Sequence, residues 1–287
     1  MNPDEWRRLI MAASDILFDS SRPRIMGVIN TTPDSFSDGG RNFLFQDALG
    51  RAELMVRVGV DAIDIGGEST RPGSAPVSST EELERVIPII EEIRKRYEVA
   101  VSIDTRKTEV AREAIKAGAH IINDVGGLRD KGMAELVASK GIPVIIMHMK
   151  GEPKTMQDNP QYDDVVAEIG AFFDEKIKQC AKLGIKKFIL DPGIGFGKTF
   201  EHNLVILKNL VKLKRPGIPL MVGHSSKGFI GKVTGHDADA RIYGTVAVSA
   251  IAIYHGADIL RVHDVVANRD AALMAKAIIM EKADLNA

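Results

Sequence analysis

GVINTTPDSFSDGG, residues 27–40, begins as an apolar strand and turns abruptly into a run of polar, glycine and proline residues. Arg24 to Ile29 form the predicted buried strand, and Asn30 then lies at its carboxyl end, where parallel α/β folds place functional groups. A strand-to-helix connection usually takes about 2–6 residues. The much longer segment after Asn30, with its carboxylates and glycines, is therefore predicted to be a functional loop.

A repeated unit runs along the chain: a short stretch rich in Val and Ile, a polar residue at its end, and then an amphipathic helix. The predicted strands are RIMGVIN ending at Asn30, AIDIGG ending at Gly67, AVSIDT ending at Thr105, HIINDV ending at Val125, PVIIMHM ending at Met149, KFILDPG ending at Gly193, PLMVGH ending at His224 and ILRVHD ending at Asp264. This alternation predicts an α/β fold with a parallel sheet. Eight such units are the number that closes a TIM (β/α)8 barrel.

The chain is predicted to form a single domain, because no Ser/Pro-rich linker or charge run divides it. Residues 1–22 stand outside the repeated pattern. They are expected to form an N-terminal extension, a helix or hairpin that closes the amino-terminal end of the barrel. Residues 23–287 are expected to form the barrel domain.

Local signals mark several helix ends. Ser79 followed by Glu82 predicts a capping box that opens a helix over 81–96, with a kink at Pro88. Gly118 and Gly184 each follow a helical pattern and precede a strand, which predicts left-handed caps at both glycines.

Composition narrows the class of function. With 38 basic and 39 acidic residues the net charge is −1, which argues against a nucleic-acid or membrane surface and favours small-molecule partners. The single cysteine, Cys180, is predicted to lie in the core, and it excludes an intrachain disulfide and a multi-cysteine metal site. The amino terminus mixes acids with bases and has no long apolar run, so no signal peptide or membrane span is expected. The expected compartment is the cytoplasm.

The polar residues at the strand ends are expected to converge, because all strands of a closed parallel barrel end on one face. They are Asn30, Glu68, Thr70, Arg71, Asp104, Asn123, Asp191, Lys227, Arg261 and His263. The alternative is that each caps the following helix, which we accept for Thr105 and Asp124. Helix capping does not account for the cation Lys227, nor for Arg261 and His263, which are expected to point to the same side of the last strand.

Two groups stand out within this set. Arg261, His263 and Asn30 belong to the last and first strands, and Ser225 and Ser226 follow the seventh. Barrels often bind phosphate after the seventh and eighth strands, so Arg261, His263 and Asn30 are predicted to hold a diphosphate. Asn30 offers a hard oxygen ligand to a magnesium ion that keeps most of its waters. Asp104, Asn123 and Asp191 form the second group. Because carboxylates accept paired hydrogen bonds from a flat amidine or guanidine edge, this trio is predicted to bind a polar heterocycle.

GIGFGKT, residues 193–199, resembles a phosphate-binding loop, but Pro192 stands where the first glycine must be and the spacing fails. We interpret it as a flexible loop that lets Phe196 approach a flat ligand. His148 on the fifth strand is predicted to be packed, since no second histidine at suitable spacing makes a zinc site.

GVINTTPDSFSDGG, DIGGESTRPG, SIDT, IINDVGG, MHMKGEPKTMQ, LDPGIGFGK and RVHDV, in this order and at these strand ends, closely resemble the dihydropteroate synthase family of pterin-binding barrels. The resemblance covers about residues 24 to 282. It implies a transferase of folate biosynthesis that condenses 6-hydroxymethyl-7,8-dihydropterin diphosphate with p-aminobenzoate to give dihydropteroate and diphosphate. It also implies a target of sulfonamides and a homodimer. The apolar helix over 244–254 is either a surface for that dimer or part of the packing of the barrel.

The resemblance implies a role for each matching position. The implied positions are Asp104, Asn123, Asp191, Lys227 and Met147 in the pterin pocket; Asn30, Arg261 and His263 at the diphosphate and magnesium; Phe36, Asp38, Thr70, Arg71 and Pro72 in loops that close over the aminobenzoate; and Phe196 and Gly223 as further substrate contacts. The catalytic roles fall to Asp38, Asp104, Asp191, Lys227, Arg261 and His263. Diphosphate leaves first, aided by Mg²⁺, and the amine then attacks the exocyclic methylene. Loop closure keeps water away.

One departure from the family concerns the second substrate. The family usually reads Ser-Arg-Lys-Ser after the seventh strand, whereas this chain reads Ser225-Ser226-Lys227-Gly228. The missing serine commonly helps to hold the aminobenzoate carboxylate. A backbone amide at Gly228 or a shifted loop are the alternatives.

Two other classes of function share some of these features. A barrel that passes a methyl group from methyltetrahydrofolate to a corrinoid protein would share the fold and the Asp/Asn pocket, but it would not be expected to carry TPDSFSDGG or ESTRPG. A non-catalytic binding module would have little use for the anion site at Asn30, Arg261 and His263. Binding of pterin diphosphate without turnover would favour the binding module.

Overall fold

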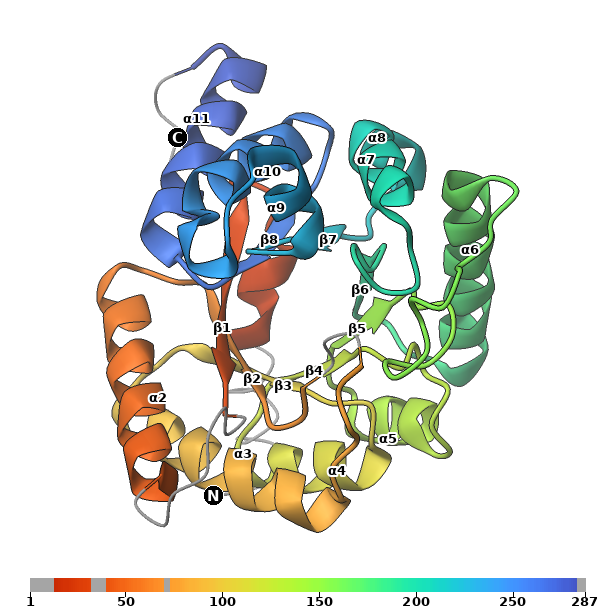
Figure 1. The fold of residues 1–287 in the computed structure, drawn as a ribbon. Coiled ribbons are helices and arrows are strands. Elements are labelled where there is room, and N and C mark those ends of the chain that lie inside the picture. The colour runs from red at the N-terminus through yellow and green to blue at the C-terminus, as the bar shows by residue number, and fades with distance from the viewer. Residues whose placement is uncertain (1–12, 32–39, 70–72, 283–287) are drawn as a thin grey trace.

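The computed structural model describes residues 13–31, 40–69 and 73–282, and it shows a barrel of parallel strands surrounded by helices (Figure 1). The strands are β1 (Arg24–Asn30), β2 (Ala62–Gly66), β3 (Ala100–Asp104), β4 (Ile121–Asp124), β5 (Val144–Met147), β6 (Phe188–Asp191), β7 (Met221–Gly223) and β8 (Ile259–Val262). Their order in the eight-stranded sheet is β6-β5-β4-β3-β2-β1-β8-β7, and a parallel bridge between Leu190 and Leu220 joins β6 to β7. The predicted TIM barrel is confirmed.

Helices follow the strands around the outside of the barrel. The helical elements of the described segments are η1 (Ile16–Phe18), α2 (Gly40–Arg57), α3 (Ser79–Arg96), α4 (Thr108–Ala117), α5 (Met133–Lys140), α6 (Val165–Leu183), α7 (Phe200–Lys208), α8 (Leu210–Leu213), α9 (Gly228–Thr234), η2 (Ala238–Ala240), α10 (Ile242–Tyr254) and α11 (Val265–Met280). None of them combines the length and the apolar character that crossing a bilayer requires.

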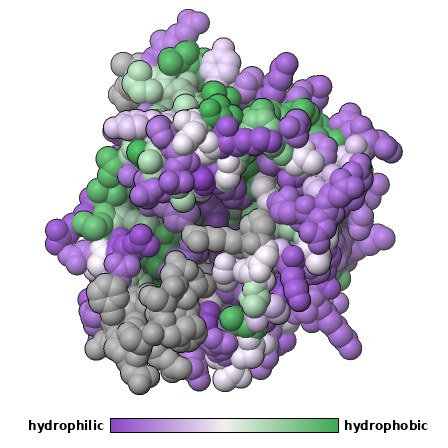
Figure 2. Space-filling view, in the orientation of Figure 1, coloured by the Kyte–Doolittle hydropathy of each residue, from purple (hydrophilic) through white to green (hydrophobic). Residues whose placement is uncertain are grey.

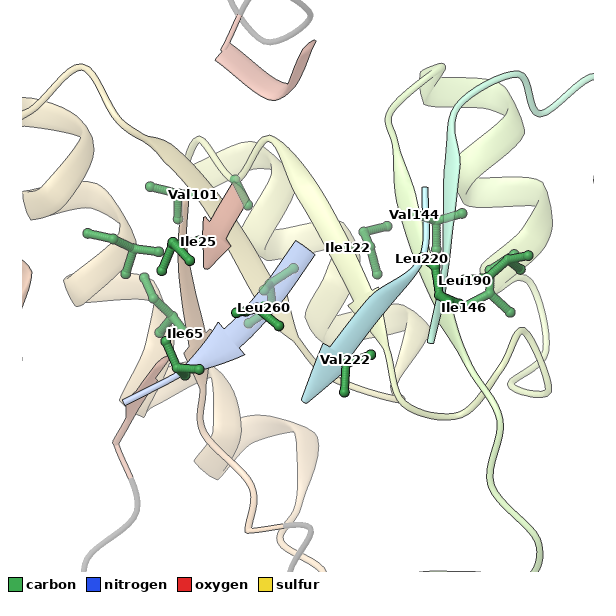
Figure 3. Packing of buried hydrophobic residues seen from close by; sticks show 14 of the residues in the cluster. Ile25, Ile65, Val101, Ile122, Val144, Ile146, Leu190, Leu220, Val222 and Leu260 are labelled. Carbon is green, nitrogen blue, oxygen red and sulfur yellow. The ribbon is translucent and has the colours of Figure 1, made fainter. Parts of the chain in front are cut away.

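Alternate side chains of each strand face outward to the helices and inward to the barrel axis. The outward residues, among them Ile25, Val101 and Leu260, form a continuous apolar layer under the helices (Figure 3). Burial on both faces explains why the strands read as near-continuous Val/Ile runs. Cys180 of α6 is fully buried, as predicted, and burial raises the pKa of its thiol to about 11.

The inward residues at the amino-terminal ends of the strands form an apolar layer of their own. This layer consists of Met26, Ala62, Ala100, Ile121, Ile145, Ile189, Met221 and Ile259. Leu17 of η1 packs on it and is almost fully buried. Just beyond it, buried Arg24 pairs with Asp61, whose other oxygen accepts from the Ile25 amide at 2.8 Å. The described part of the N-terminal segment therefore lies across the amino-terminal end of the barrel.

The two predicted glycine caps agree with the structure, whereas the predicted serine cap of α3 does not. Gly118 and Gly184 adopt left-handed backbone at the ends of α4 and α6, as predicted. The predicted capping box at Ser79 is wrong. Ser78 caps α3 by accepting from the Glu81 amide at 3.1 Å, and the buried Glu82 side chain pairs with Lys107.

Candidate functional site

The barrel interior becomes polar two residues beyond the apolar layer. By strand alternation, the inward positions of this middle layer are Val28, Asp64, Ser102, Asn123, Met147, Asp191, Gly223 and Arg261. Asp64 is 0 % exposed, Asn123 2 % and Asp191 4 %. Barrels of this class usually fill these positions with branched aliphatic residues. Because burying charge is costly, such a concentration of polar groups indicates a site.

Arg261 joins two of the buried carboxylates. Its Nε lies 2.6 Å from Asp64 Oδ2, and its Nη2 lies 2.5 Å from Asp104 Oδ2. Asn123 Nδ2 donates to the same Asp64 oxygen at 2.9 Å. Burial raises the pKa of Asp104 to about 7, a shift that Arg261 opposes and Asp64 reinforces. Burial acts to lower the pKa of Arg261, but Asp64 and Asp104 outweigh it and raise that pKa, so Arg261 is charged.

Several acceptor atoms of this cluster lack a hydrogen-bond donor. Within the described residues, Asp64 Oδ1, Asp104 Oδ1, Asn123 Oδ1 and Ser102 Oγ are buried without a partner. An unsatisfied buried polar atom costs about 1–3 kcal/mol. A ligand that presents several N–H donors along one edge would satisfy these atoms together. The arrangement thus supports the predicted amidine- or guanidine-like heterocycle.

Asp191 and Lys227 lie beside this cluster. Asp191 Oδ1 accepts from the Gly193 amide at 2.7 Å, and burial raises the pKa of its carboxyl. A Cβ built on Gly223 would lie 3.8 Å from Asp191 Oδ2 and 3.7 Å from Arg261 Cδ. Lys227 directly precedes α9, and burial lowers its pKa to about 7 against the attraction of Asp191. Its ammonium donates to the Ile194 carbonyl.

An apolar wall adjoins the polar residues. Phe196 packs against Val125, Met147, Met149 and Met156. Met147 pairs with Asp191 in the register of β5 and β6, so this wall begins directly next to the carboxylate. The Lys227 ammonium lies 4.3 Å from the centre of the Phe196 ring. A flat ring held by the polar edge would therefore meet an apolar and aromatic surface.

The glycines of the 193–199 loop serve close packing, in contrast to the predicted flexible loop. A Cβ on Gly193 would lie 2.0 Å from the His148 carbonyl oxygen, and one on Gly197 would lie 2.2 Å from that of Lys150. Both glycines have positive φ, of 66° and 62°. Only glycine fits these two positions, because they combine left-handed backbone with contact against the segment after β5.

Side chains also bond the carbonyls of this loop. Gln157 donates to Gly195 O at 2.6 Å, Lys198 to Phe196 O at 2.9 Å and Tyr162 to Gly197 O at 2.8 Å. Lys198 Nζ also lies 3.0 Å from His148 Nδ1. His148 is thus packed, as predicted, and burial lowers its pKa to about 2. Phe196 is consequently held by a firmly bonded loop.

Asn30 and His263 lie nearer the mouth of the barrel. Asn30 is exposed at the end of β1, and a Cβ built on Gly66 would lie 3.6 Å from both Asn30 Oδ1 and Asp104 Oδ2. His263 is exposed after β8, with Nδ1 3.0 Å from Ser225 Oγ. Arg261 was expected beside His263. Its guanidinium instead pairs with Asp64 and Asp104 deeper in the barrel. The attraction of these two carboxylates is stronger than any that the exposed rim offers.

Other predicted positions lie outside this cluster or outside the described residues. Phe36, Asp38, Thr70, Arg71 and Pro72 are outside the described residues. Glu68 is buried in ion pairs with Arg106 and Lys107 and accepts from the Val77 amide, so it braces the segment that follows β2.

Thr105 and Asp124, interpreted as helix caps, instead hold the turns after their strands. Thr105 Oγ1 accepts from the Lys107 amide, and Asp124 accepts from the amides of Gly126 and Leu128. The residues that precede α4 and α5 as N-caps are Lys107 and Gly132.

Asp64 was missed at the sequence level. It lies inside AIDIG rather than at a strand end. The available signal was a lone carboxylate within an otherwise apolar strand. Within the described ranges, no group of three or more His, Cys, Asp or Glu side chains is arranged to hold a metal.

Comparison with known proteins places this site in a family. The model of the family "Pterin binding enzyme" matches residues 26–263. Dihydropteroate synthase of Escherichia coli (strain K12) is 48% identical over 266 residues, which cover 92% of this chain and 94% of that protein.

Solved structures of dihydropteroate synthases superpose closely on this chain. The Yersinia pestis dihydropteroate synthase in a sulfonamide drug complex superposes with a TM-score of 0.86 at 45% identity, covering 91% of this chain and 96% of that one. The Xanthomonas albilineans dihydropteroate synthase with 4-aminobenzoic acid gives 0.84 at 44% identity, covering 91% and 94%. The chain belongs to the pterin-binding enzyme family and, within it, to the dihydropteroate synthases, which are transferases.

Proposed function

We propose that this chain condenses 6-hydroxymethyl-7,8-dihydropterin diphosphate with p-aminobenzoate, giving dihydropteroate and diphosphate for folate biosynthesis. The observation that carries the proposal is the set of buried acceptors on Asp64, Asp104 and Asn123 that lack donors. The 2-amino pyrimidinone edge of a pterin presents N–H donors, the groups that carboxylate and amide oxygens accept.

The proposed roles of the remaining residues follow from their positions. Phe196 and Met147 pack against the flat rings. Arg261 and Lys227 supply positive charge beside the reacting centre, while His263 and Ser225 donate hydrogen bonds to the departing diphosphate. Departure leaves a cation conjugated into the pterin ring, which the carboxylates of Asp104 and Asp191 stabilise electrostatically. The amine of p-aminobenzoate then attacks the exocyclic methylene and loses a proton.

Magnesium is the proposed metal, and Asn30 is the proposed protein ligand. Its amide oxygen is exposed at the end of β1, and a hard oxygen of this kind suits a magnesium ion that keeps several waters. The described residues contain no cluster of acidic or imidazole ligands that would form an all-protein cage. The donor set therefore fits an ion carried mainly by the diphosphate. When bound, magnesium neutralises charge on the leaving group.

Release of diphosphate, measured with and without p-aminobenzoate, tests the proposed reaction. We expect sustained release to require both substrates and to match the dihydropteroate formed, because the amine must consume the cation that each departing diphosphate leaves. Binding of the pterin diphosphate with no release in the presence of p-aminobenzoate would support a binding module instead. A methyl-transferring barrel would give no release with either mixture.

Gly228→Ser is expected to lower the KM for p-aminobenzoate roughly 10- to 100-fold, because one hydrogen bond to a charged carboxylate contributes about 1.5–3 kcal/mol. Gly228 is the exposed first residue of α9, and no atom lies within 4 Å of a Cβ built there, so serine fits without strain. Steady-state kinetics with p-aminobenzoate measure the effect. Gly228→Ala is the matched control and should leave the KM unchanged. An unaltered KM in the serine variant would show that another group already holds the carboxylate.

A homodimer is the proposed assembly. α10 and α11 pack against each other (Figure 1). They carry exposed apolar side chains, among them Tyr243, which is 83 % exposed, Met274 and Ile278. Hydrophobic residues are visible on the surface in this part of the molecule (Figure 2). A second copy of this chain would cover them. We expect light scattering to give twice the chain mass at micromolar concentration, and Ile278→Glu to give the monomer. A wild-type monomer would contradict the proposed assembly.

The cytoplasm is the proposed compartment, in keeping with a free buried thiol.

A further inference from the structure

A buried chain of hydrogen bonds links the end of β7 to α10 and α11. It runs through His224, Ser249 and Asn268, each of which is 0 % exposed. His224 Nε2 lies 2.8 Å from Ser249 Oγ, and Ser249 Oγ lies 2.6 Å from Asn268 Oδ1. Asn268 Nδ2 donates to the carbonyl of Asp264 at 2.6 Å. These short contacts between buried groups form a continuous path between two loops of the barrel mouth.

The donors and acceptors fix the direction of this path. Because Asn268 uses its amide nitrogen on Asp264 O, its Oδ1 accepts, and the single hydroxyl proton of Ser249 goes there. Ser249 Oγ must then accept from His224, which therefore carries its proton on Nε2. Burial lowers the pKa of His224 to about 4, so the ring is neutral. Every bond runs from His224 toward Asp264, and aligned bonds of this kind strengthen one another.

This direction excludes a nucleophilic role. Serine, histidine and asparagine are the residue types of hydrolytic triads, in which the histidine Nε2 accepts the serine proton. Here the histidine donates to the serine, and the serine hydroxyl donates to the asparagine. The buried chain is therefore a structural support rather than a second catalytic centre.

The two ends of the chain lie next to a pair of residues at the barrel mouth. His224 directly precedes Ser225, and Asp264 directly follows His263. Ser225 Oγ contacts His263 Nδ1 at 3.0 Å and accepts from the His263 amide at 3.3 Å. The buried hydrogen bonds thus connect the loops after β7 and β8 beneath the barrel mouth. Ser225 and His263 connect the same two loops at the mouth itself.

We propose that His224, Ser249 and Asn268 are positioning residues that set the separation of Ser225 and His263 for the diphosphate of the pterin substrate. This inference rests on the proposed function. The acceptors for the pterin ring lie mainly on β2, β3 and β4, whereas the buried chain supports only the loops after β7 and β8. Loss of the chain should therefore weaken recognition of the diphosphate and spare recognition of the ring.

Calorimetry on His224→Leu and His224→Gln, each with 6-hydroxymethylpterin and with its diphosphate, tests this inference. We expect His224→Leu to bind the diphosphate about tenfold more weakly, a change of about 1.4 kcal/mol, and to bind the diphosphate-free pterin like wild type. His224→Gln should restore the diphosphate affinity, because its amide nitrogen can donate to Ser249. Ser249→Ala removes one hydroxyl from the same series of hydrogen bonds and is a smaller change. It replaces His224→Leu in the test if the leucine variant does not fold, and the same loss of diphosphate affinity is expected.

Ala252→Gly is the matched control, because Ala252 is buried on the same helix α10 and the change lowers stability without cutting the chain. It should leave both affinities unchanged. Equal loss of both ligands in His224→Leu, wild-type affinity for both, or a glutamine variant as weak as leucine would overturn the inference. Wild-type protein that binds neither pterin would overturn the proposed function itself, and the inference with it.

Discussion

Asp191→Asn is expected to weaken the binding of a pterin ligand roughly 100- to 1000-fold, or about 3–4 kcal/mol. Asp191 Oδ1 already accepts from the Gly193 amide at 2.7 Å, which leaves Oδ2 for the ligand. An asparagine has one oxygen and one NH₂ group. Whichever way its amide turns, the NH₂ group meets either the Gly193 N–H or the donor edge of the pterin, so one pair of donors always repels.

Calorimetry with a pterin ligand measures this loss. Asp61→Asn is a suitable control, because Asp61 is also buried but lies at the amino-terminal end of the barrel, where it pairs with Arg24. It should lower the melting temperature and leave the affinity unchanged. Wild-type affinity in Asp191→Asn would remove Asp191 from the pocket.

Chelation of divalent metal is expected to abolish turnover with little change in the melting temperature. The proposed ion has Asn30 as its protein ligand and depends on the diphosphate for the rest, so the fold does not depend on it. Diphosphate release and thermal unfolding, each with and without chelator, measure the two effects. Re-addition of Mg²⁺ should restore turnover. A large fall in melting temperature on chelation would instead show a structural metal.

The architecture could be predicted because the strands are apolar on both faces and are separated by helical segments. RIMGVIN, for example, matches β1 residue for residue. The start of α3 could not be placed correctly, since Ser78 and Ser79 are equally good caps and each is followed three residues later by a glutamate, Glu81 or Glu82. The deciding interaction is the pairing of Glu82 with Lys107, which is distant in the sequence.

The polar residues at the strand ends could be predicted as a site because barrel topology brings them together. Asp64 could not, because a single carboxylate inside an apolar strand does not reveal which side it faces. The depth of Arg261 also depends on the carboxylates around it, which lie on strands β2 and β3. The glycines of the 193–199 loop were assigned to flexibility, since the sequence gives no sign of the carbonyls packed against them.

The charged middle layer of the barrel has a consequence for how the molecule can change. Aliphatic residues at positions 64, 123 or 191 would give a more cohesive interior, as in other barrels of this class, and would erase recognition of the substrate. Cohesion is supplied elsewhere, by the shell of helices around the strands and by Leu17 on the apolar layer at the opposite end. Substitutions that raise the stability of the fold are therefore expected in those two regions, whereas the centre of the barrel must keep the polar residues that bind the substrate.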